Sequence, residues 1–158
     1  MIKFFNHYLE AKSVEPITNK EQQLKGIDCY VILQSGTKLK VDNKVRRTAY
    51  TDICFEIESN QTSVGWAINP TKETDLIAYY SHKIDLLFFI GYKAAREYIC
   101  KNWKDWQMGR RPWGVKRTIA KQGGSLSFSI QAEVLKENQI KVYEIPNAWA
   151  NLVCLHSK

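Results

Sequence analysis

The sequence has few of the features that mark secreted, membrane or metal-thiolate proteins. Its longest apolar run, residues 86–90, is far shorter than the roughly 20 residues needed to cross a bilayer. The four cysteines are widely spaced and form no CxxC pair, so neither a zinc site nor a disulfide framework is expected. The first residues also lack the apolar stretch of a signal peptide. We therefore expect a soluble cytoplasmic protein with reduced thiols and no membrane partner.

No internal repeat, low-complexity tract or linker rich in proline, glycine or serine divides the chain. Its 158 residues, 44% of them hydrophobic and 25% charged, fit a single domain over residues 1–158. There is no glycine-rich phosphate loop, and no serine has a histidine and an acid at a recognisable spacing. Nucleoside triphosphatases and serine hydrolases are therefore not expected.

The chain carries a formal charge of +7, from 23 Lys and Arg against 16 Asp and Glu. Such an excess favours a polyanionic partner, because cationic side chains that bind nucleic acid release its counterions. The basic residues concentrate in one short segment: Arg110, Arg111, Lys116, Arg117 and Lys121. Trp113 lies among them, which is typical of a loop that grips a nucleic-acid backbone and stacks on a base. A solvated basic loop, or one that meets an acidic partner protein, explains the segment equally well.

Hydrophobic periodicity predicts a run of strands with helices at either end. Helices are expected over residues 2–12 and 92–105, where apolar side chains recur at helical spacing. Strands are expected over the following ranges: 27–33, 38–46, 52–58, 75–81, 84–90, 125–133 and 140–145. This order indicates an α+β fold built on a mixed or antiparallel sheet.

The strands at 27–33 and 38–46 flank a three-residue turn at 34–36, which has glycine where a positive φ is common. A hairpin turn determines the register of its strands, and with this turn paired residue numbers sum to 70. Asp28 is therefore expected opposite Asp42, with the two Cβ atoms about 5 Å apart.

Two carboxylates that face each other across a ladder repel unless a cation lies between them. Oxygen ligands suit Mg²⁺ or Mn²⁺, which is typically held by one or two carboxylates with water and a substrate phosphate. Lys44 shares the face of Asp42 and is placed to orient or help deprotonate the attacking water. Glu56, on the polar face of strand 52–58, would add a ligand if that strand neighbours the hairpin. On spacing alone, a surface ion pair between Asp42 and Lys44 accounts for the pattern as well.

Asp28 together with Asp42-Asn43-Lys44 resembles the motif of the PD-(D/E)XK nuclease superfamily, with an aspartate and an acid-x-lysine on successive core strands. The resemblance implies a restriction-endonuclease-like fold, a mixed β-sheet flanked by helices, of the small phage or bacterial type. Ile27 stands where the family has proline, and Asp42 where glutamate is commoner. The glutamine that marks the exonuclease branch is absent after the lysine, which favours an endonuclease.

The same resemblance implies Mg²⁺- or Mn²⁺-dependent hydrolysis of phosphodiester bonds in DNA. The two aspartates and the backbone carbonyl of Asn43 would bind the ion, and Lys44 would position the attacking water. An acid on an early helix often completes such a site, and Glu10 and Glu21 are both candidates. The choice among Glu10, Glu21 and Glu56 stays open at this point.

Arg46 and Arg47 follow the motif and would hold a phosphate near the ion, while the segment at 110–121 would grip the DNA. A small nuclease that cuts two strands would act as a homodimer, although the sequence shows neither a coiled coil nor an apolar patch for one. The alternative hypothesis is a nucleic-acid-binding module that keeps the fold without catalysis. DNA against RNA, and endonuclease against exonuclease, are choices that the sequence leaves open.

Overall fold

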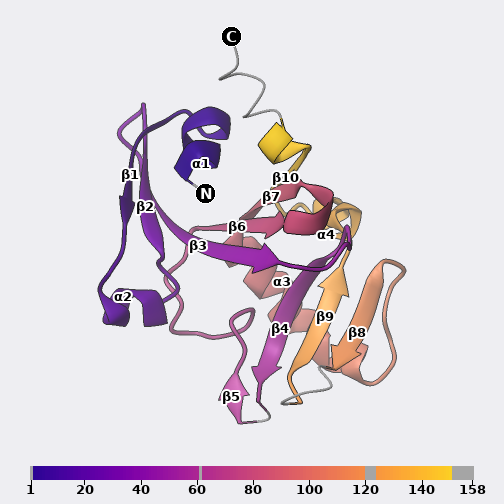
Figure 1. Cartoon of the computed structure of the whole chain (residues 1–158). Coiled ribbons are helices and arrows are strands. Elements are labelled where there is room, and N and C mark those ends of the chain that lie inside the picture. Colours follow the sequence, from indigo (N-terminus) through magenta and orange to yellow (C-terminus); the bar gives the residue numbers. More distant parts are fainter. Residues whose placement is uncertain (1, 61, 120–123, 151–158) are drawn as a thin grey trace. The chain divides into compact units, whose positions relative to one another are not determined.

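The computed structural model describes residues 2–60, 62–119 and 124–150, which form two compact units (Figure 1). The first unit comprises Met1–Thr51, Glu73–Ile90 and Tyr143–Lys158, and the second comprises Asp52–Lys72 and Gly91–Val142. Each unit has a β-sheet of its own, and helices occur in both. The predicted α+β class is therefore confirmed, but two sheets replace the single one expected. The single domain expected over residues 1–158 stays a prediction.

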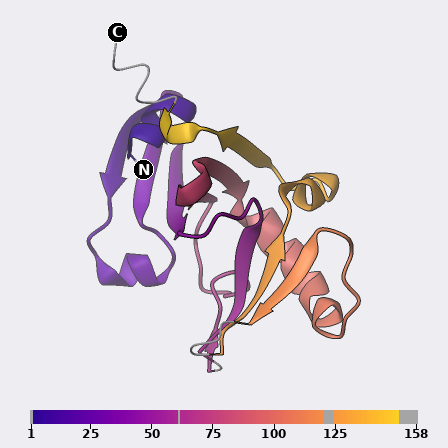
Figure 2. The ribbon, with the colours of Figure 1, turned by 45° about the vertical axis from the view of Figure 1, so that its right-hand side comes forward.

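The first unit contains a six-stranded sheet in the order β1-β2-β3-β6-β7-β10. Its strands are β1 (Ala11–Pro16), β2 (Cys29–Leu33), β3 (Lys38–Arg46), β6 (Leu76–Ser81), β7 (Leu86–Gly91) and β10 (Val142–Pro146). β2 pairs antiparallel with both β1 and β3, and Figure 2 shows these three strands side by side. β3 pairs in parallel with β6, so the sheet is mixed.

The first unit also contains two short helices and one 3₁₀ turn, α1 (Ile2–Tyr8), α2 (Lys20–Leu24) and η1 (His82–Ile84), and residues 148–150 are helical after β10. α1 contributes Phe4 and Phe5 to a buried cluster on one face of the sheet, with Cys29, Val31, Val41, Ala78, Leu87, Phe89 and Ala148. Burying each phenylalanine contributes about 1.5–3 kcal/mol. Since a seven-residue helix is marginal by itself, this packing is what holds α1 in place.

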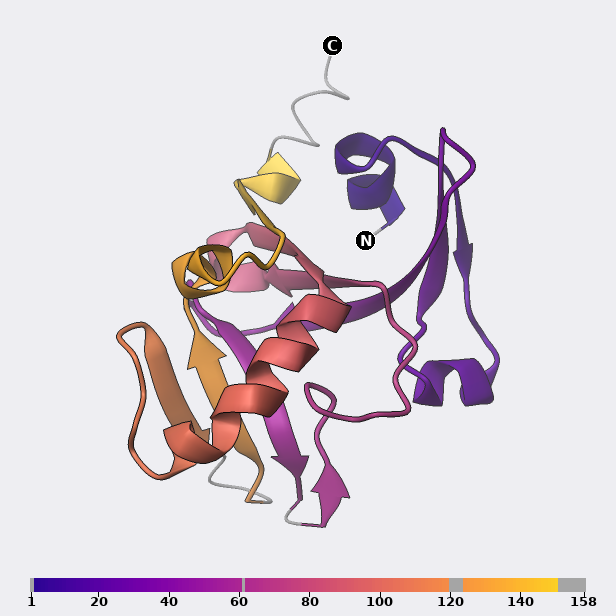
Figure 3. The same cartoon turned by 180° about the vertical axis from the view of Figure 1, so that it is seen from behind.

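The second unit contains a four-stranded antiparallel sheet in the order β5-β4-β9-β8. Its elements are β4 (Ile53–Ser59), β5 (Ser63–Val64), α3 (Tyr92–Gln107), β8 (Val115–Ile119), β9 (Leu126–Ile130) and α4 (Ala132–Glu137). α3 lies across one face of this sheet (Figure 3), and the Trp106 ring meets the Phe128 ring edge-on at 5.4 Å between centroids. Side chains of Ile53, Phe55 and Ile57 alternate into the core of β4, as the sequence predicts.

Several expected elements have different bounds or a different type. The helix expected over residues 2–12 ends at Tyr8, because Glu10 adopts a φ of +50° and β1 begins at Ala11. The strand expected over 125–133 ends at Ile130, and α4 follows it. The segment expected as a basic loop contains β8, whose pairing with β9 no local pattern announces. β1 and α2 were not predicted because each is short and mostly polar.

No helix within the described ranges is long and apolar enough to span a bilayer.

Candidate functional site

The hairpin of β2 and β3 has the register that its turn predicts. Cys29 lies opposite Val41 and Ile32 lies opposite Lys38, so paired residue numbers sum to 70. At the turn, Gly36 adopts a φ of +83°, the left-handed conformation expected of it. The register was derivable because a three-residue turn leaves few ways to align the two strands.

Asp28 lies one residue beyond the last ladder pair of this hairpin, and three hydrogen bonds hold it there. Its N–H donates to the carbonyl of Val41 at 2.9 Å, and its carbonyl accepts from the N–H of Ile17 at 2.8 Å. Its side-chain Oδ2 accepts from the backbone N–H of Asn43 at 2.8 Å. The regular cross-strand pair expected between Asp28 and Asp42 is thus replaced by a side-chain bond. That bond brings the Asp28 carboxylate to the peptide group directly after Asp42.

Asp42 is almost fully buried, although the alternation of the hairpin places it on the polar face. It is only 4% exposed, and Lys44 Nζ lies 2.8 Å from its Oδ1. Asp42 aligns with Ile77 of β6 in the parallel ladder, so a neighbouring strand covers it on a side that hairpin reasoning leaves open. An ionised carboxylate at such depth is costly unless it is paired and hydrogen-bonded. The Lys44 side chain is 29% exposed and therefore connects the buried acid to solvent.

Asn43 contributes to the site through its backbone. Its side chain lies on the other face of β3, where Nδ2 contacts Cys29 Sγ at 3.9 Å. Its Oδ1 is buried there and accepts no hydrogen bond from the described residues. In an extended strand the N–H and C=O of one residue point to the same edge. Because the N–H meets Asp28, the Asn43 carbonyl faces the same edge as the Asp28 carboxylate.

The chemistry of this donor set fits a hard divalent cation. Two carboxylates and one backbone carbonyl are oxygen ligands of the kind that Mg²⁺ and Mn²⁺ prefer, and such ions keep several waters. Oδ1 of Asp28 accepts no hydrogen bond from residues 2–60, 62–119 or 124–150, which leaves a ligand atom on that carboxylate. No cluster of three or more His, Cys, Asp or Glu side chains suited to a metal occurs among the described residues. A cation here would therefore be held by two acids, the carbonyl and water.

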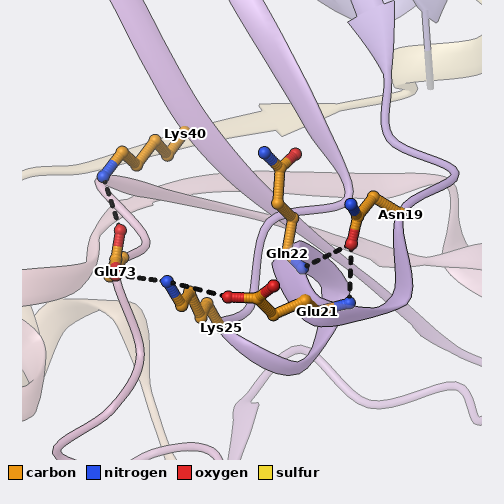
Figure 4. Close-up of polar contacts among 6 residues, drawn as sticks. All are labelled: Asn19, Glu21, Gln22, Lys25, Lys40 and Glu73. Carbon is orange, nitrogen blue, oxygen red and sulfur yellow. Dashed lines mark hydrogen bonds and ion pairs between the residues drawn. The ribbon is translucent and has the colours of Figure 1, made fainter.

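Glu21, one candidate for a third acid, belongs to a surface network of charges shown in Figure 4. Its carboxylate lies 3.6 Å from Lys25 Nζ, which is 3.4 Å from Glu73; Glu73 in turn bonds Lys40 at 2.9 Å. The Glu21 side chain is 78% exposed. Asn19 caps α2 by accepting from the N–H of Glu21 at 2.8 Å, which sets the start of the helix. The Glu21 carboxylate therefore points toward Lys25.

The charges of this network shift one another's proton affinities. The hydrogen bond from Lys40 is the main cause that lowers the pKa of Glu73, and the bond from Lys25 adds to it. Conversely, the hydrogen bond to Glu73 raises the pKa of both Lys25 and Lys40. Because the three groups are exposed, the network contributes little to stability. Its role is to tie α2 to β3 and to the segment before β6.

The other two candidates for a third acid lie away from Asp28 along the sheet or in the other unit. Glu10 precedes Ala11, which pairs with Leu33 at the turn end of β2. Leu33 lies five positions after Asp28, which is about 16 Å at 3.3 Å per residue. Glu56 lies on β4 of the second unit, and β4 pairs with β5 and β9. β4 therefore does not neighbour the hairpin in a sheet, which was the condition for Glu56 to add a ligand.

Arg46 and Arg47 follow the candidate site at the end of β3. By alternation Arg46 shares the face of Asp42 and Lys44, and its Nε donates to Thr48 Oγ1 at 2.8 Å. Its guanidinium also lies over the Tyr50 ring, 4.9 Å from the centroid. Arg47 is exposed. The two residues therefore add positive charge where β3 and β6 end, because Arg46 and Ser81 are the last aligned pair.

The basic residues of the second unit lie on a turn and on the edge strand β8. Arg110 pairs with Asp105 at 3.1 Å, and Arg111 donates to the carbonyl of Trp106 at 2.9 Å. Lys116 and Arg117 are exposed on β8. Lys121 lies outside the described residues. Trp113 is 79% exposed and lies in the turn between Arg111 and β8.

Sequence reasoning missed Asp85, which organises the end of the first unit. It adopts a φ of +49° after η1, and its Oδ1 accepts from the Tyr80 hydroxyl at 2.8 Å and from the Trp149 N–H at 2.7 Å. Its Oδ2 accepts from the Ala150 N–H at 3.0 Å. The one signal in the sequence is an aspartate in the turn between two apolar strands, where left-handed conformations are tolerated.

Comparison with protein-family models, curated proteins and solved structures found no match to this chain.

Proposed function

We propose that this protein is a Mg²⁺- or Mn²⁺-dependent nuclease that hydrolyses phosphodiester bonds of DNA at the open end of the β2–β3 hairpin. One observation carries the proposal: the carboxylate of Asp28 bonds the peptide directly after Asp42, whose buried carboxylate pairs with Lys44. These contacts support a site in which two acids and an ammonium, from the start of β2 and from β3, act together at one end of the hairpin. The motif resemblance and the positive net charge support the same function.

The residues of the site have separate roles in this proposal. Asp28, Asp42 and the carbonyl of Asn43 would hold the ion, which when bound supplies Lewis-acid stabilisation of phosphate charge. Lys44 holds the attacking water by its ammonium and offsets the negative charge that develops on the phosphoryl group. Arg46 lies on the same face and is placed to hold a phosphate oxygen.

The energetics of Asp42 also support a functional role. Burying an ion pair is often no better for stability than packing apolar side chains of similar volume. Placing Asp42 at 4% exposure therefore brings little stability that an apolar residue would not bring. Titratable groups buried beside a specific charge partner concentrate at functional sites. A catalytic acid explains this arrangement, whereas a surface ion pair does not, because Asp42 is not on the surface.

Basic residues on both units support a nucleic-acid partner. Arg47 of the first unit and Lys116 and Arg117 of the second are exposed, as phosphate contacts need to be. DNA is the substrate proposed, and the proposal includes a cytoplasmic location. A homodimer would allow both strands of a duplex to be cleaved. Sedimentation in the presence of DNA would show whether the protein dimerises.

Cleavage of DNA with and without Mg²⁺ or Mn²⁺ tests the proposed function. Asp42→Asn and Lys44→Gln should each lower the cleavage rate at least about 100-fold, because each removes an interaction with the reacting groups. The matched control is the exposed ion pair between Glu15 of β1 and Lys38 of β3, 3.2 Å apart. Glu15→Gln and Lys38→Gln should cut like the parent. Cleavage at the parental rate by folded Asp42→Asn and Lys44→Gln would exclude this mechanism.

A non-catalytic nucleic-acid-binding module is the second candidate, favoured by the exposure of Trp113 beside Arg110 and Arg111. Calorimetric titration with Mn²⁺ separates the two functions. A nuclease should bind the ion, and Asp28→Asn should abolish the binding heat. A module without catalysis should show salt-sensitive affinity for DNA and no heat from the ion at this site.

A further inference from the structure

The first unit contains a pocket of about 360 Å³ lined by Phe4, Val45, Tyr80, His82 and Trp149. The lining residues come from five parts of the unit: α1, β3, β6, η1 and the helical residues 148–150 after β10. Pockets of about 300–1,000 Å³ with apolar and aromatic walls are typical of small-ligand sites. The proposed nuclease site does not include this pocket, since Val45 points to the face opposite Lys44 and Asp42.

The walls of the pocket are mostly rings. Phe4 is buried, and its ring lies 5.2 Å from that of Tyr80 and 6.0 Å from that of Trp149 between centroids. The His82 ring meets the Tyr80 ring at a steep angle, 6.0 Å away. Trp149 is 48% exposed and Val45 is 60% exposed, so the pocket opens to solvent beside a flat indole. Such walls suit a planar ring, which gains from stacking and edge contacts with aromatic side chains.

Asp85 holds two of these walls in place without a ligand. The carboxylate accepts from the Tyr80 hydroxyl at 2.8 Å and from the backbone N–H of Trp149 at 2.7 Å, and the Ala148 N–H donates to the Asp85 carbonyl at 3.0 Å. The Tyr80 ring and the backbone that carries Trp149 are therefore positioned before a ligand arrives. Preorganisation of this kind lowers the entropy cost of binding.

The charges around the pocket favour an anionic ligand over a cation. Aromatic cages also bind quaternary ammonium groups, but an unsatisfied carboxylate would help such a site. Here both oxygens of Asp85 already accept hydrogen bonds. Exposed Lys83 follows the pocket residue His82, whereas Lys44 and Arg46 of β3 lie on the opposite face of the strand. The combination of an aromatic pocket and a neighbouring lysine matches a base with an attached phosphate.

We propose that this aromatic pocket binds an unstacked nucleobase of a single-stranded segment of nucleic acid. The inference rests on the proposed function and names the form of its substrate. β3 and β6 both end at the aligned pair Arg46–Ser81, one residue beyond Val45. A nucleic-acid strand that passes over this end of the sheet reaches the pocket on one face and Lys44 on the other face. A base in the pocket would thus anchor the nucleic acid while a neighbouring phosphate lies at Asp28 and Asp42.

Binding of a short single-stranded oligodeoxynucleotide with one fluorescent 2-aminopurine tests the inference. The parent protein is used in EDTA, so neither ion binding nor cleavage is needed. Binding should quench the fluorescence, because the analogue stacks on Trp149. Trp149→Ala should weaken binding roughly 5- to 150-fold, the equivalent of one base–aromatic stack. Val45→Glu, at an exposed position that tolerates substitution, should also weaken binding by placing an anion at the border.

Tyr143→Ala is the control, because Tyr143 is an aromatic residue of the same unit, 62% exposed, and does not line the pocket. It should bind like the parent. Competition by deoxyadenosine monophosphate as strong as that by the oligonucleotide would assign the pocket to free nucleotides instead of a strand. Parental affinity in both Trp149→Ala and Val45→Glu, or tighter binding of choline than of nucleotides, would overturn the inference. Because cleavage is measured in a separate experiment, the proposal of base binding in the pocket and the proposal of nuclease activity can be refuted independently.

Discussion

Lys44 Nζ lies 2.8 Å from Oδ1 of Asp42, two residues earlier on the same strand, and the carboxylate is shielded from solvent while the lysine is not. Residues two apart on a strand share a face, so this contact is available to any D-x-K sequence. What distinguishes the contact between Asp42 and Lys44 is the burial of the carboxylate. On the surface such a pair would contribute almost nothing, but at 4% exposure for Asp42 the two charges depend on each other.

A double-mutant cycle should measure this dependence. Lys44→Met leaves a buried carboxylate without its cation and should lower the free energy of unfolding by about 1–3 kcal/mol. Adding Asp42→Asn should restore part of the loss, because it removes the buried charge that the Lys44 ammonium offset. Urea unfolding of the four proteins gives the coupling energy. The exposed pair Glu15–Lys38 should couple by less than about 0.5 kcal/mol, and equal coupling in the two pairs would contradict the argument.

Alkaline pH should reveal the environment of Tyr80. Burial first, and then the hydrogen bond to Asp85, raise the pKa of Tyr80 from 10.0 to about 12. Because the folded pKa lies above the unfolded one, the stability that this group contributes is complete below about pH 10. It is lost as the pH rises through about 12. Absorbance of the phenolate should therefore show a tyrosine that ionises well above pH 10.

Asp85→Asn tests the cause of this shift. Asparagine tolerates the φ of +49° at position 85 and still accepts the Tyr80 hydroxyl, but carries no charge. The pKa of Tyr80 should fall yet stay above 10.0, since burial is the larger cause. An unchanged late-ionising tyrosine in Asp85→Asn would mean that burial alone is responsible.

Two glycines should respond very differently to alanine. A Cβ at Gly65 would overlap the backbone carbonyl of Glu56, which cannot move without breaking β4, so Gly65→Ala should cost about 2–3 kcal/mol. A Cβ at Gly36 meets nothing within 4 Å, and only its φ of +83° opposes substitution. Gly36→Ala should therefore cost about 1–2 kcal/mol. Urea unfolding compares the two variants, and a smaller loss for Gly65→Ala would contradict the steric argument.

Much of the fold was predictable wherever the deciding interactions are local. The hairpin turn at Gly36 and the alternation of β4 were both predicted correctly. β1 and β8 were missed because each is a polar strand at a sheet edge that forms only when its partner is present. The early end of α1 has the same origin: residue 11 joins a strand and cannot continue the helix.

Within the candidate site, the sequence also predicted the register that relates Asp28 to Asp42. It did not predict that Asp28 would leave the ladder and bond the Asn43 N–H through its side chain. Nor could it choose among the additional acids. Pairing of Ala11 with Leu33 places Glu10 at the far end of β2, and pairing of β4 with β9 places Glu56 in the other sheet.

The sequence by itself determined the hairpin and the order of Asp28, Asp42 and Lys44 along it, because a short turn and a period of two leave few alternatives. Tertiary structure alone decided that Asp42 is buried. Its cover includes β6, more than 30 residues along the chain, which pairs in parallel with β3. Parallel partners are selected by packing over long separations, and no local pattern encodes that choice.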